Sequence, residues 1–203
     1  MDEIAGPVGR LEARWDVTPN VEPRAVAVVA SPHPQYGGTM QDKVTYHATQ
    51  GLLRVGCAVL RFNYRGVGTS AGAFDGGNGE MDDYRAALDA AAARFPNVPI
   101  WAIGYSFGAH KAMVAGAQDD RVELLLGIAA LVDTDDYTVV RASDKPKLLI
   151  HGERDEVCSL KTIRRFYGEL EEPRELIVID MADHFFDGHT SEVADAVEDL
   201  LGD

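Results

Sequence analysis

Short runs of apolar residues recur along the chain, and turn-forming residues bound most of them. In six of these runs the apolar side chains follow one another without strict alternation: Ala25–Ala30, Cys57–Asn63, Pro99–Gly104, Leu124–Ala130, Lys147–His151 and Glu175–Asp180. Continuous apolarity is typical of parallel strands that helices cover on both faces. A seventh run, Leu11–Val17, alternates better, and we expect it to form an antiparallel edge strand.

Amphipathic helical patterns lie between these runs. Thr39–Asp42 resembles a capping box, and Val44, Ala48 and Leu52 follow it at helical spacing. Further helices are predicted over Glu80–Phe95, Ser106–Gln118 and Ser159–Leu170, and a last helix carries Val193, Val197, Leu200 and Leu201. This alternation predicts an α/β fold, with a mostly parallel central sheet of about seven strands and helices on both faces. Ligands of such sheets bind beyond the carboxyl ends of the strands.

The composition indicates one domain over residues 1–203, because neither a repeat nor a Gly/Ser-rich linker divides the chain. Apolar residues make up 46% and charged residues 26%, which excludes a disordered or fibrous chain. The net charge of −14 disfavours nucleic acids and anionic membranes as partners. No membrane span or signal peptide is visible, and two cysteines, Cys57 and Cys158, are too few for a disulfide framework. We therefore expect a cytoplasmic protein with reduced thiols.

The sharpest chemical signal is the segment Gly104–Gly108 (GYSFG), which follows a predicted strand directly and opens a predicted helix. In a G-x-S-x-G sequence of this kind, a strained turn lifts the serine hydroxyl above the edge of the sheet. Glycine is needed on both sides of the serine because strand and helix cross there with no room for a Cβ. Ser106 is therefore the candidate nucleophile, and the Phe107 N–H can face a developing oxyanion.

A serine hydroxyl is a poor nucleophile until a histidine accepts its proton, and an acid must orient that histidine. Around a serine on such a turn, the chain order is serine, acid, histidine. This order removes three of the six histidines: His33, His47 and His110. His151 is discounted because it precedes the best acid and lies at a strand end. His184 lies in the loop after the last predicted strand, whereas His189 suits the entry to the final helix, so we predict His184 as the base.

The acid is expected in the loop after the strand Lys147–His151, where the chain offers Glu153, Asp155 and Glu156. Glu153 lies nearer the strand, and Glu156 is better suited to pair with surface arginines. Asp155 lies in the loop beyond the strand end and between the serine and His184, so it is the predicted orienting acid.

A second oxyanion donor is expected in the loop after Ala25–Ala30, which reads SPHPQYGG over residues 31–38. Two of these residues are prolines, which have no N–H to donate. The donor is therefore His33, Gln35 or Tyr36. We favour the Gln35 N–H, with that of Tyr36 close behind.

Together, these motifs resemble the α/β-hydrolase superfamily. The resemblance rests on His33-Pro34 with Gly37-Gly38, Arg61–Gly68 (RFNYRGVG), Gly104–Gly108, Gly152–Asp155 (GERD) and Asp183–Phe186 (DHFF). More narrowly, the chain looks like small, capless, cytoplasmic hydrolases related to dienelactone hydrolases and dipeptidyl-peptidase-like serine hydrolases. The resemblance implies the following roles: Ser106 as nucleophile, Asp155 as acid, His184 as base, and Phe107 and Gln35 as oxyanion donors. Dienelactone hydrolases themselves carry cysteine at the elbow, so their own activity is not expected here.

The expected activity is cleavage of a carboxylic ester of a small or medium substrate through an acyl-enzyme, without a cofactor. Only Leu131–Pro146 separates the strands between which such hydrolases often insert a helical cap, so we expect an open site or one that a second subunit of a homodimer completes. Acidic residues in this segment favour neutral or cationic esters over anionic ones. Tyr36, Phe74 and Phe185, together with Phe107, are the candidate apolar pocket.

Several alternatives remain at this point. The same residues suit a peptidase or amidase that acts on short peptides, and the fold alone is compatible with a non-catalytic binding protein. A phosphate loop at Arg61–Gly68 is disfavoured because no Gly-Lys-Ser/Thr follows. A metal site at Asp183, His184, Asp187 and His189 is disfavoured because the fixed helical pair of such sites is missing and because His184 is already needed as the base.

Overall fold

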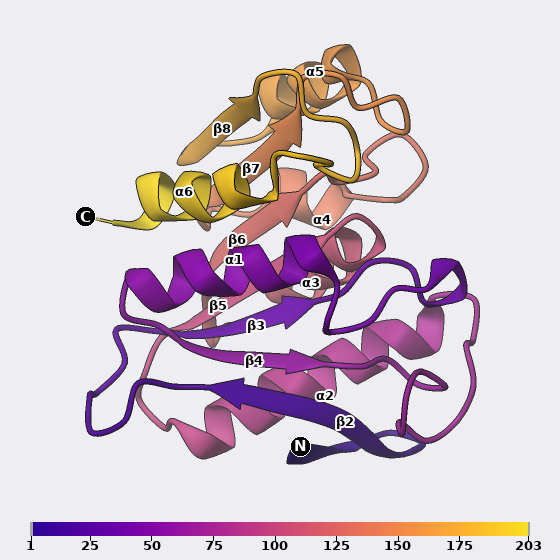
Figure 1. Cartoon of the computed structure of the whole chain (residues 1–203), viewed down its shortest axis with the longest axis vertical. Helices are drawn as coiled ribbons and strands as arrows, with labels where there is room; N and C mark the ends of the chain where they lie inside the picture. Colours follow the sequence, from indigo (N-terminus) through magenta and orange to yellow (C-terminus); the bar gives the residue numbers. More distant parts are fainter. Residues whose placement is uncertain (1, 203) are drawn as a thin grey trace.

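The computed structural model describes residues 2–202, which form one eight-stranded sheet with helices on both faces (Figure 1). The strands are β1 (Asp2–Gly6), β2 (Gly9–Asp16), β3 (Val26–Ala30), β4 (Ala58–Phe62), β5 (Ile100–Tyr105), β6 (Val122–Ile128), β7 (Lys147–Gly152) and β8 (Arg174–Ile179). The helices are α1 (Lys43–Arg54), α2 (Asn78–Arg94), α3 (Phe107–Ala117), α4 (Thr138–Arg141), α5 (Leu160–Glu169) and α6 (Thr190–Leu201), with a 3-10 turn, η1 (Pro34–Tyr36).

The strand order is β1-β2-β4-β3-β5-β6-β7-β8, and the six strands from β3 to β8 run parallel. These are the six continuous apolar runs, so the predicted mostly parallel α/β sheet is confirmed. The alternating run Leu11–Val17 corresponds to β2, which pairs antiparallel with β4. The prediction that it forms the edge was wrong, because β1 pairs with its outer side, from Asp2 against Ala13 to Gly6 against Gly9. This hairpin also supplies the eighth strand.

Two apolar cores cover the two faces of the sheet. Along β3, Val26 and Val28 contact the core beneath α2, α3 and α5, whereas Ala27 and Val29 contact the core beneath α1 and α6. Figure 1 shows α1 and α6 together in front of the sheet and α2 and α3 behind it. Because both faces are covered, the central strands contain few polar residues.

The helix ends differ in detail from the sequence prediction. Helix α1 is capped by Asp42, whose side chain accepts hydrogen bonds from the N–H groups of Val44 and Thr45, at 2.9 and 3.3 Å. Thr39 lies before the cap, so the predicted box begins three residues too early. The one-turn helix α4 has no amphipathic period of its own; Tyr137 and Val140 anchor it by burial in the core.

The loops after β3, β5, β6, β7 and β8 all leave the sheet at its carboxyl edge, because the strands are parallel. This arrangement brings residues 31–42, Ser106, Asp155 and His184 to the same end of the molecule although they are far apart in sequence. Among the described helices, none combines the length and apolarity that a membrane crossing requires.

Candidate functional site

Ser106 lies at the tight turn between β5 and α3, where its φ of 54° places it in the left-handed region. A Cβ on Gly104 would lie 2.1 Å from the carbonyl oxygen of Gly108, and a Cβ on Gly108 would lie 2.5 Å from that of Ser31. Gly104 is therefore required for β5 and α3 to cross this closely, and Gly108 is required for α3 to approach the end of β3. The strained backbone is held by the hydrogen bond from the Ser106 N–H to the carbonyl of Ile128, at 2.8 Å.

The three side chains singled out in the sequence lie in one hydrogen-bonded row. Ser106 Oγ is 3.0 Å from His184 Nε2, and His184 Nδ1 is 2.8 Å from Asp155 Oδ2. All three residues are buried. With Asp155 ionised, its oxygen accepts the Nδ1–H, and Nε2 is left free to accept the proton of the serine hydroxyl. The geometry is that of a nucleophile, a base and an orienting acid.

Asp155 is held rigidly at the end of β7. Its second oxygen, Oδ1, accepts hydrogen bonds from the backbone N–H groups of Val157 and Cys158, each at 2.8 Å. Burial raises the pKa of Asp155, but the hydrogen bonds from His184 and from the Cys158 N–H outweigh it and hold that pKa below its ordinary value. The carboxyl group is therefore ionised at neutral pH, as an acceptor for His184 must be.

The loop that carries His184 is anchored by Tyr105, the residue that precedes Ser106. The Tyr105 hydroxyl donates a hydrogen bond of 3.0 Å to the carbonyl oxygen of His184. Two non-glycine residues of this loop, Met181 and Phe186, have φ values of 62° and 52°. Phe186 is buried in the core beneath α1 and α6, whereas its neighbour Phe185 points to the surface. The packing of Phe186 thus fixes where His184 lies.

Sequence reasoning set His151 aside, but the structure places it directly behind Asp155. His151 is fully buried, and its Nε2 lies 2.7 Å from the carbonyl of Cys158 and 3.6 Å from Asp155 Oδ2. Burial lowers the pKa of His151, so its neutral ring donates from Nε2 to the carbonyl. The sequence signal that could have placed His151 beside Asp155 was its position near the end of β7, immediately before the GERD segment.

The loop after β3 is folded into the turn η1, and this turn uses two of the three candidate N–H groups. The Gln35 N–H is 3.2 Å from His33 Nδ1, and the Tyr36 N–H is 3.0 Å from the His33 carbonyl. Within residues 2–202, neither the His33 N–H nor the Phe107 N–H has a hydrogen-bond acceptor. The favoured residue, Gln35, thus has its N–H engaged, and His33 is the candidate whose N–H is available.

A cavity of about 350 Å³ opens above Ser106 and His184. Of the predicted pocket residues, Tyr36 and Phe185 line it. Phe74 lies outside the lining and packs against the ring of His33, with centroids 5.1 Å apart. Leu131 and Val157, which the sequence did not single out, add apolar surface to the cavity. The site is therefore open to ligands and largely apolar.

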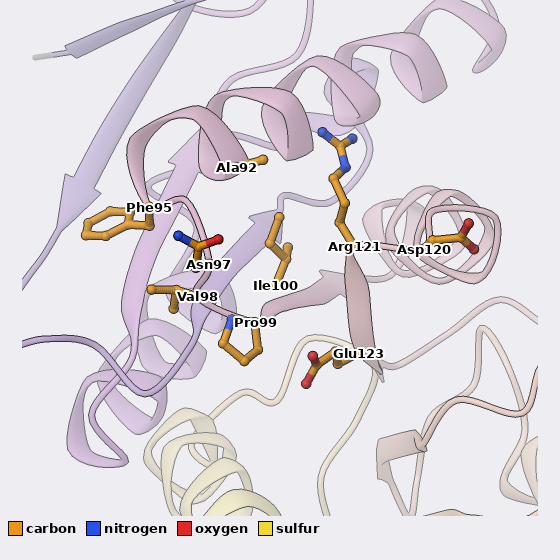
Figure 2. A pocket seen from close by; sticks show the side chains of 9 residues that line it. All are labelled: Ala92, Phe95, Asn97, Val98, Pro99, Ile100, Asp120, Arg121 and Glu123. Atoms are coloured by element: carbon orange, nitrogen blue, oxygen red, sulfur yellow. The ribbon is translucent and has the colours of Figure 1, made fainter.

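Elsewhere in residues 2–202, the cavities away from Ser106 contain no second serine–histidine–aspartate row of this kind. A further cavity, of about 310 Å³, is lined by residues that include Phe95, Ile100 and Arg121, and Figure 2 shows these side chains from close by. Ile100 begins β5, so this cavity lies at the opposite end of that strand from Ser106. Among the residues that the structure describes, no group of three or more His, Cys, Asp or Glu side chains is arranged to hold a metal ion.

The Arg61–Gly68 segment, considered above as a phosphate loop, has its arginines bound to protein carboxylates. Arg61 Nη2 lies 2.7 Å from Asp16, and Arg65 Nη2 lies 2.7 Å from the buried Asp83. Both arginines are themselves buried. These pairs brace the loop after β4 beside the site.

The fold and the position of the serine turn define the class: this is an α/β serine hydrolase without a cap domain. The model of the family described as serine aminopeptidase, S33, matches residues 23–144. The chain belongs to this family.

Relatives and solved structures agree with this assignment. An uncharacterized protein of Rickettsia prowazekii (strain Madrid E) is 36% identical over 207 residues, which cover 97% of this chain and 86% of that protein. An alpha-beta serine hydrolase homologue from Coxiella burnetii has a TM-score of 0.93 at 32% identity, covering 98% of this chain and 96% of the other. A Xanthomonas campestris structure, described as an a/b serine hydrolase without lid, has a TM-score of 0.88 at 33% identity, with coverages of 98% and 91%.

Proposed function

We propose that this α/β hydrolase cleaves a carboxylic ester of a small or medium substrate, with Ser106 as nucleophile, His184 as general base and Asp155 as orienting acid. The observation that carries the proposal is the continuous row of hydrogen bonds, 3.0 Å from Ser106 Oγ to His184 Nε2 and 2.8 Å from His184 Nδ1 to Asp155 Oδ2. No cofactor takes part in the proposed reaction.

In the first half of the reaction, Ser106 Oγ attacks the ester carbonyl carbon while His184 Nε2 takes the hydroxyl proton. The ionised Asp155 stabilises the imidazolium that forms and keeps Nδ1 as the protonated nitrogen. Collapse of the tetrahedral intermediate breaks the bond to the alcohol oxygen, which leaves with the proton from His184. In the second half, a water molecule attacks the acyl-serine ester while His184 accepts a proton from the water. Collapse of the second intermediate breaks the bond between the acyl carbon and Ser106 Oγ, His184 returns its proton to Oγ, and the carboxylic acid departs.

The negative charge of each tetrahedral intermediate requires donors that are already in place. We propose that these are the backbone N–H groups of Phe107 and His33. The Phe107 N–H is at the first position of α3, where helix N–H groups have no partner within the helix and the helix dipole favours an anion. Gln35 was the first choice from the sequence, but its N–H is committed to His33 Nδ1.

A second candidate activity, cleavage of a short peptide, is favoured by the description of the matching family as a serine aminopeptidase. It would use the same three side chains, and His184 would deliver its proton to an amine instead of an alcohol. Matched ester and amide substrates that share one acyl group distinguish the two activities.

The test uses a fluorophosphonate probe, which reacts with an activated serine. Wild type is expected to label and to hydrolyse esters, and Ser106→Ala is expected to lose both activities. Ser191→Ala, which removes an exposed serine from α6, is the matched control and should behave as wild type. Labelling or hydrolysis that survives in Ser106→Ala would overturn the assignment, and wild type that neither labels nor turns over esters or amides would indicate a binding protein.

A further inference from the structure

Exposed apolar side chains gather around the proposed catalytic centre, on a protein whose net charge is −14. Tyr36 is 89% exposed, Phe185 56%, Val157 53% and Met181 51%. Among the large apolar residues elsewhere in the described chain, only Val21, at 57%, is more than half exposed. Contiguous exposed apolar surface is costly in water and marks a place where an apolar ligand or partner binds.

The four side chains border two adjoining cavities. The first, of about 350 Å³, contains Ser106, His33 and Tyr36. The second, of about 370 Å³, contains Met181. Val157, His184 and Phe185 line both cavities, so these three residues form the boundary between them. The proposed base therefore lies between two spaces, each large enough for a substituent of a small ligand.

The chemistry of ester cleavage determines which part of the substrate lies in each of the two cavities. The acyl carbon must reach Ser106 Oγ and its oxygen must reach the donors at Phe107 and His33, which places the acyl group in the first cavity. The alcohol oxygen must accept its proton from His184, so the alcohol group leaves on the side of that residue. His184 also lines the second cavity, so the alcohol group is placed in that cavity.

Charge restricts the acyl group further. Asp42 lines the first cavity, and the described lining residues include neither lysine nor arginine. His33 lines it as well, as a neutral ring, because burial lowers its pKa. The second cavity has Arg154 together with Glu156 and Asp183, so its charges are mixed.

From this geometry, and on the basis of the proposed function, we propose that the substrate is an uncharged ester with an apolar group on each side of the ester bond. The acyl group lies in the Ser106 cavity against Tyr36 and Leu131. The alcohol group passes Phe185 and lies against Met181.

The experiment measures kcat/KM for a panel of esters in which acyl size and alcohol size are varied independently, from acetate to benzoate and from methyl to benzyl. Wild type should prefer the larger group on both sides. Tyr36→Ala should reduce the preference for large acyl groups about fivefold, or about 1 kcal/mol, and keep the preference for large alcohols. Met181→Ala should reduce the preference for large alcohol groups and keep the preference for large acyl groups.

Two control variants remove exposed apolar side chains away from the cavities. Tyr46→Ala changes an exposed residue on α1, and Val21→Ala changes the exposed valine noted above. Neither should alter the size preferences. Circular dichroism and unfolding midpoints establish that all four variants are folded.

The outcomes separate this inference from the proposed function. If Ser106→Ala kept its hydrolytic activity, the proposed function itself would fail. If hydrolysis depended on Ser106 but wild type had no preference for larger groups, only the present inference would be overturned. It would also be overturned if Tyr36→Ala and Met181→Ala shifted both preferences equally, if neither variant shifted a preference, or if anionic acyl esters were turned over as well as neutral ones.

Discussion

Replacement of Asp155 by asparagine is the most exacting test of the proposed catalytic row. It changes which ring nitrogen of His184 carries the proton without changing the shape of the site. Oδ1 accepts two backbone N–H groups, those of Val157 and Cys158, whereas Oδ2 accepts the Nδ1–H of His184. An asparagine must keep its carbonyl oxygen toward the two N–H groups, since its NH2 group cannot accept them. Its NH2 group is then directed at His184.

An NH2 group in that position can only donate, so His184 Nδ1 must become the acceptor and the ring proton moves to Nε2. A protonated Nε2 cannot take the proton of Ser106, and the imidazolium formed in the reaction also loses its ionic partner. The expected loss in kcat is about 10³- to 10⁴-fold, the size found when the orienting acid of a serine–histidine pair is made an amide. This loss corresponds to about 4–5.5 kcal/mol in the activation barrier.

The assay is the steady-state hydrolysis of a neutral ester, together with the rate of fluorophosphonate labelling. Asp136→Asn is the matched control, because Asp136 also accepts a backbone N–H, that of Thr138 at 2.8 Å, but lies outside the row. The control should retain wild-type kcat, and both variants should unfold as cooperatively as wild type. A loss of less than tenfold in a folded Asp155→Asn protein would refute the role assigned to Asp155.

Three further predictions follow from contacts around the site. Tyr105→Phe removes the hydrogen bond to the His184 carbonyl and should lower the free energy of unfolding by about 1–2 kcal/mol in urea titrations, with a decrease in kcat at unchanged KM. Asp42→Asn keeps a good helix cap but removes the negative charge from the Ser106 cavity. The ratio of kcat/KM for anionic acyl esters to that for neutral ones should therefore rise severalfold. The control variant Asp199→Asn, on α6, should leave that ratio unchanged. Burial lowers the pKa of His151 from 6.5, so the unfolded chain binds more protons and stability should fall as pH decreases below about 6.5. His151→Gln should flatten this slope in urea titrations between pH 5 and 8, and an unchanged slope would contradict the reasoning.

The hydrogen-bonded row of Ser106, His184 and Asp155 could be predicted from the sequence because each of its members is determined by local features. Gly104 is required by the crossing of β5 and α3, where a Cβ would lie 2.1 Å from a carbonyl oxygen, and Gly108 is required by the approach of α3 to the end of β3. Asp155 and His184 each follow a strand with a recognisable apolar run. Parallel strands then bring the three loops to the same edge of the sheet without further information.

The proposed oxyanion donor and the lining of the cavity could not be predicted in the same way. The loop SPHPQYGG indicates a tight turn, but the choice of donor depends on which N–H groups the turn itself uses. His33 supplies both its Nδ1 and its carbonyl as acceptors inside η1, so Gln35 and Tyr36 are engaged. Similarly, Phe74 is as apolar as Phe185, but tertiary packing directs it against the ring of His33 and out of the cavity lining.

The geometry at the end of β5 explains how two loops that are 78 residues apart hold a 3.0 Å contact. Successive side chains of a strand point to opposite faces, so Tyr105 enters the core beneath α1 and α6 while the turn raises Ser106 above the edge. The same core contains Phe186, two residues after His184. Ser106 and His184 are therefore each attached to a neighbour that is anchored in one packed cluster, and the hydrogen bond from the Tyr105 hydroxyl to the His184 carbonyl links the two loops directly. Because a packed core resists deformation, the distance between Oγ and Nε2 is set by this cluster and not by the exposed loop surface.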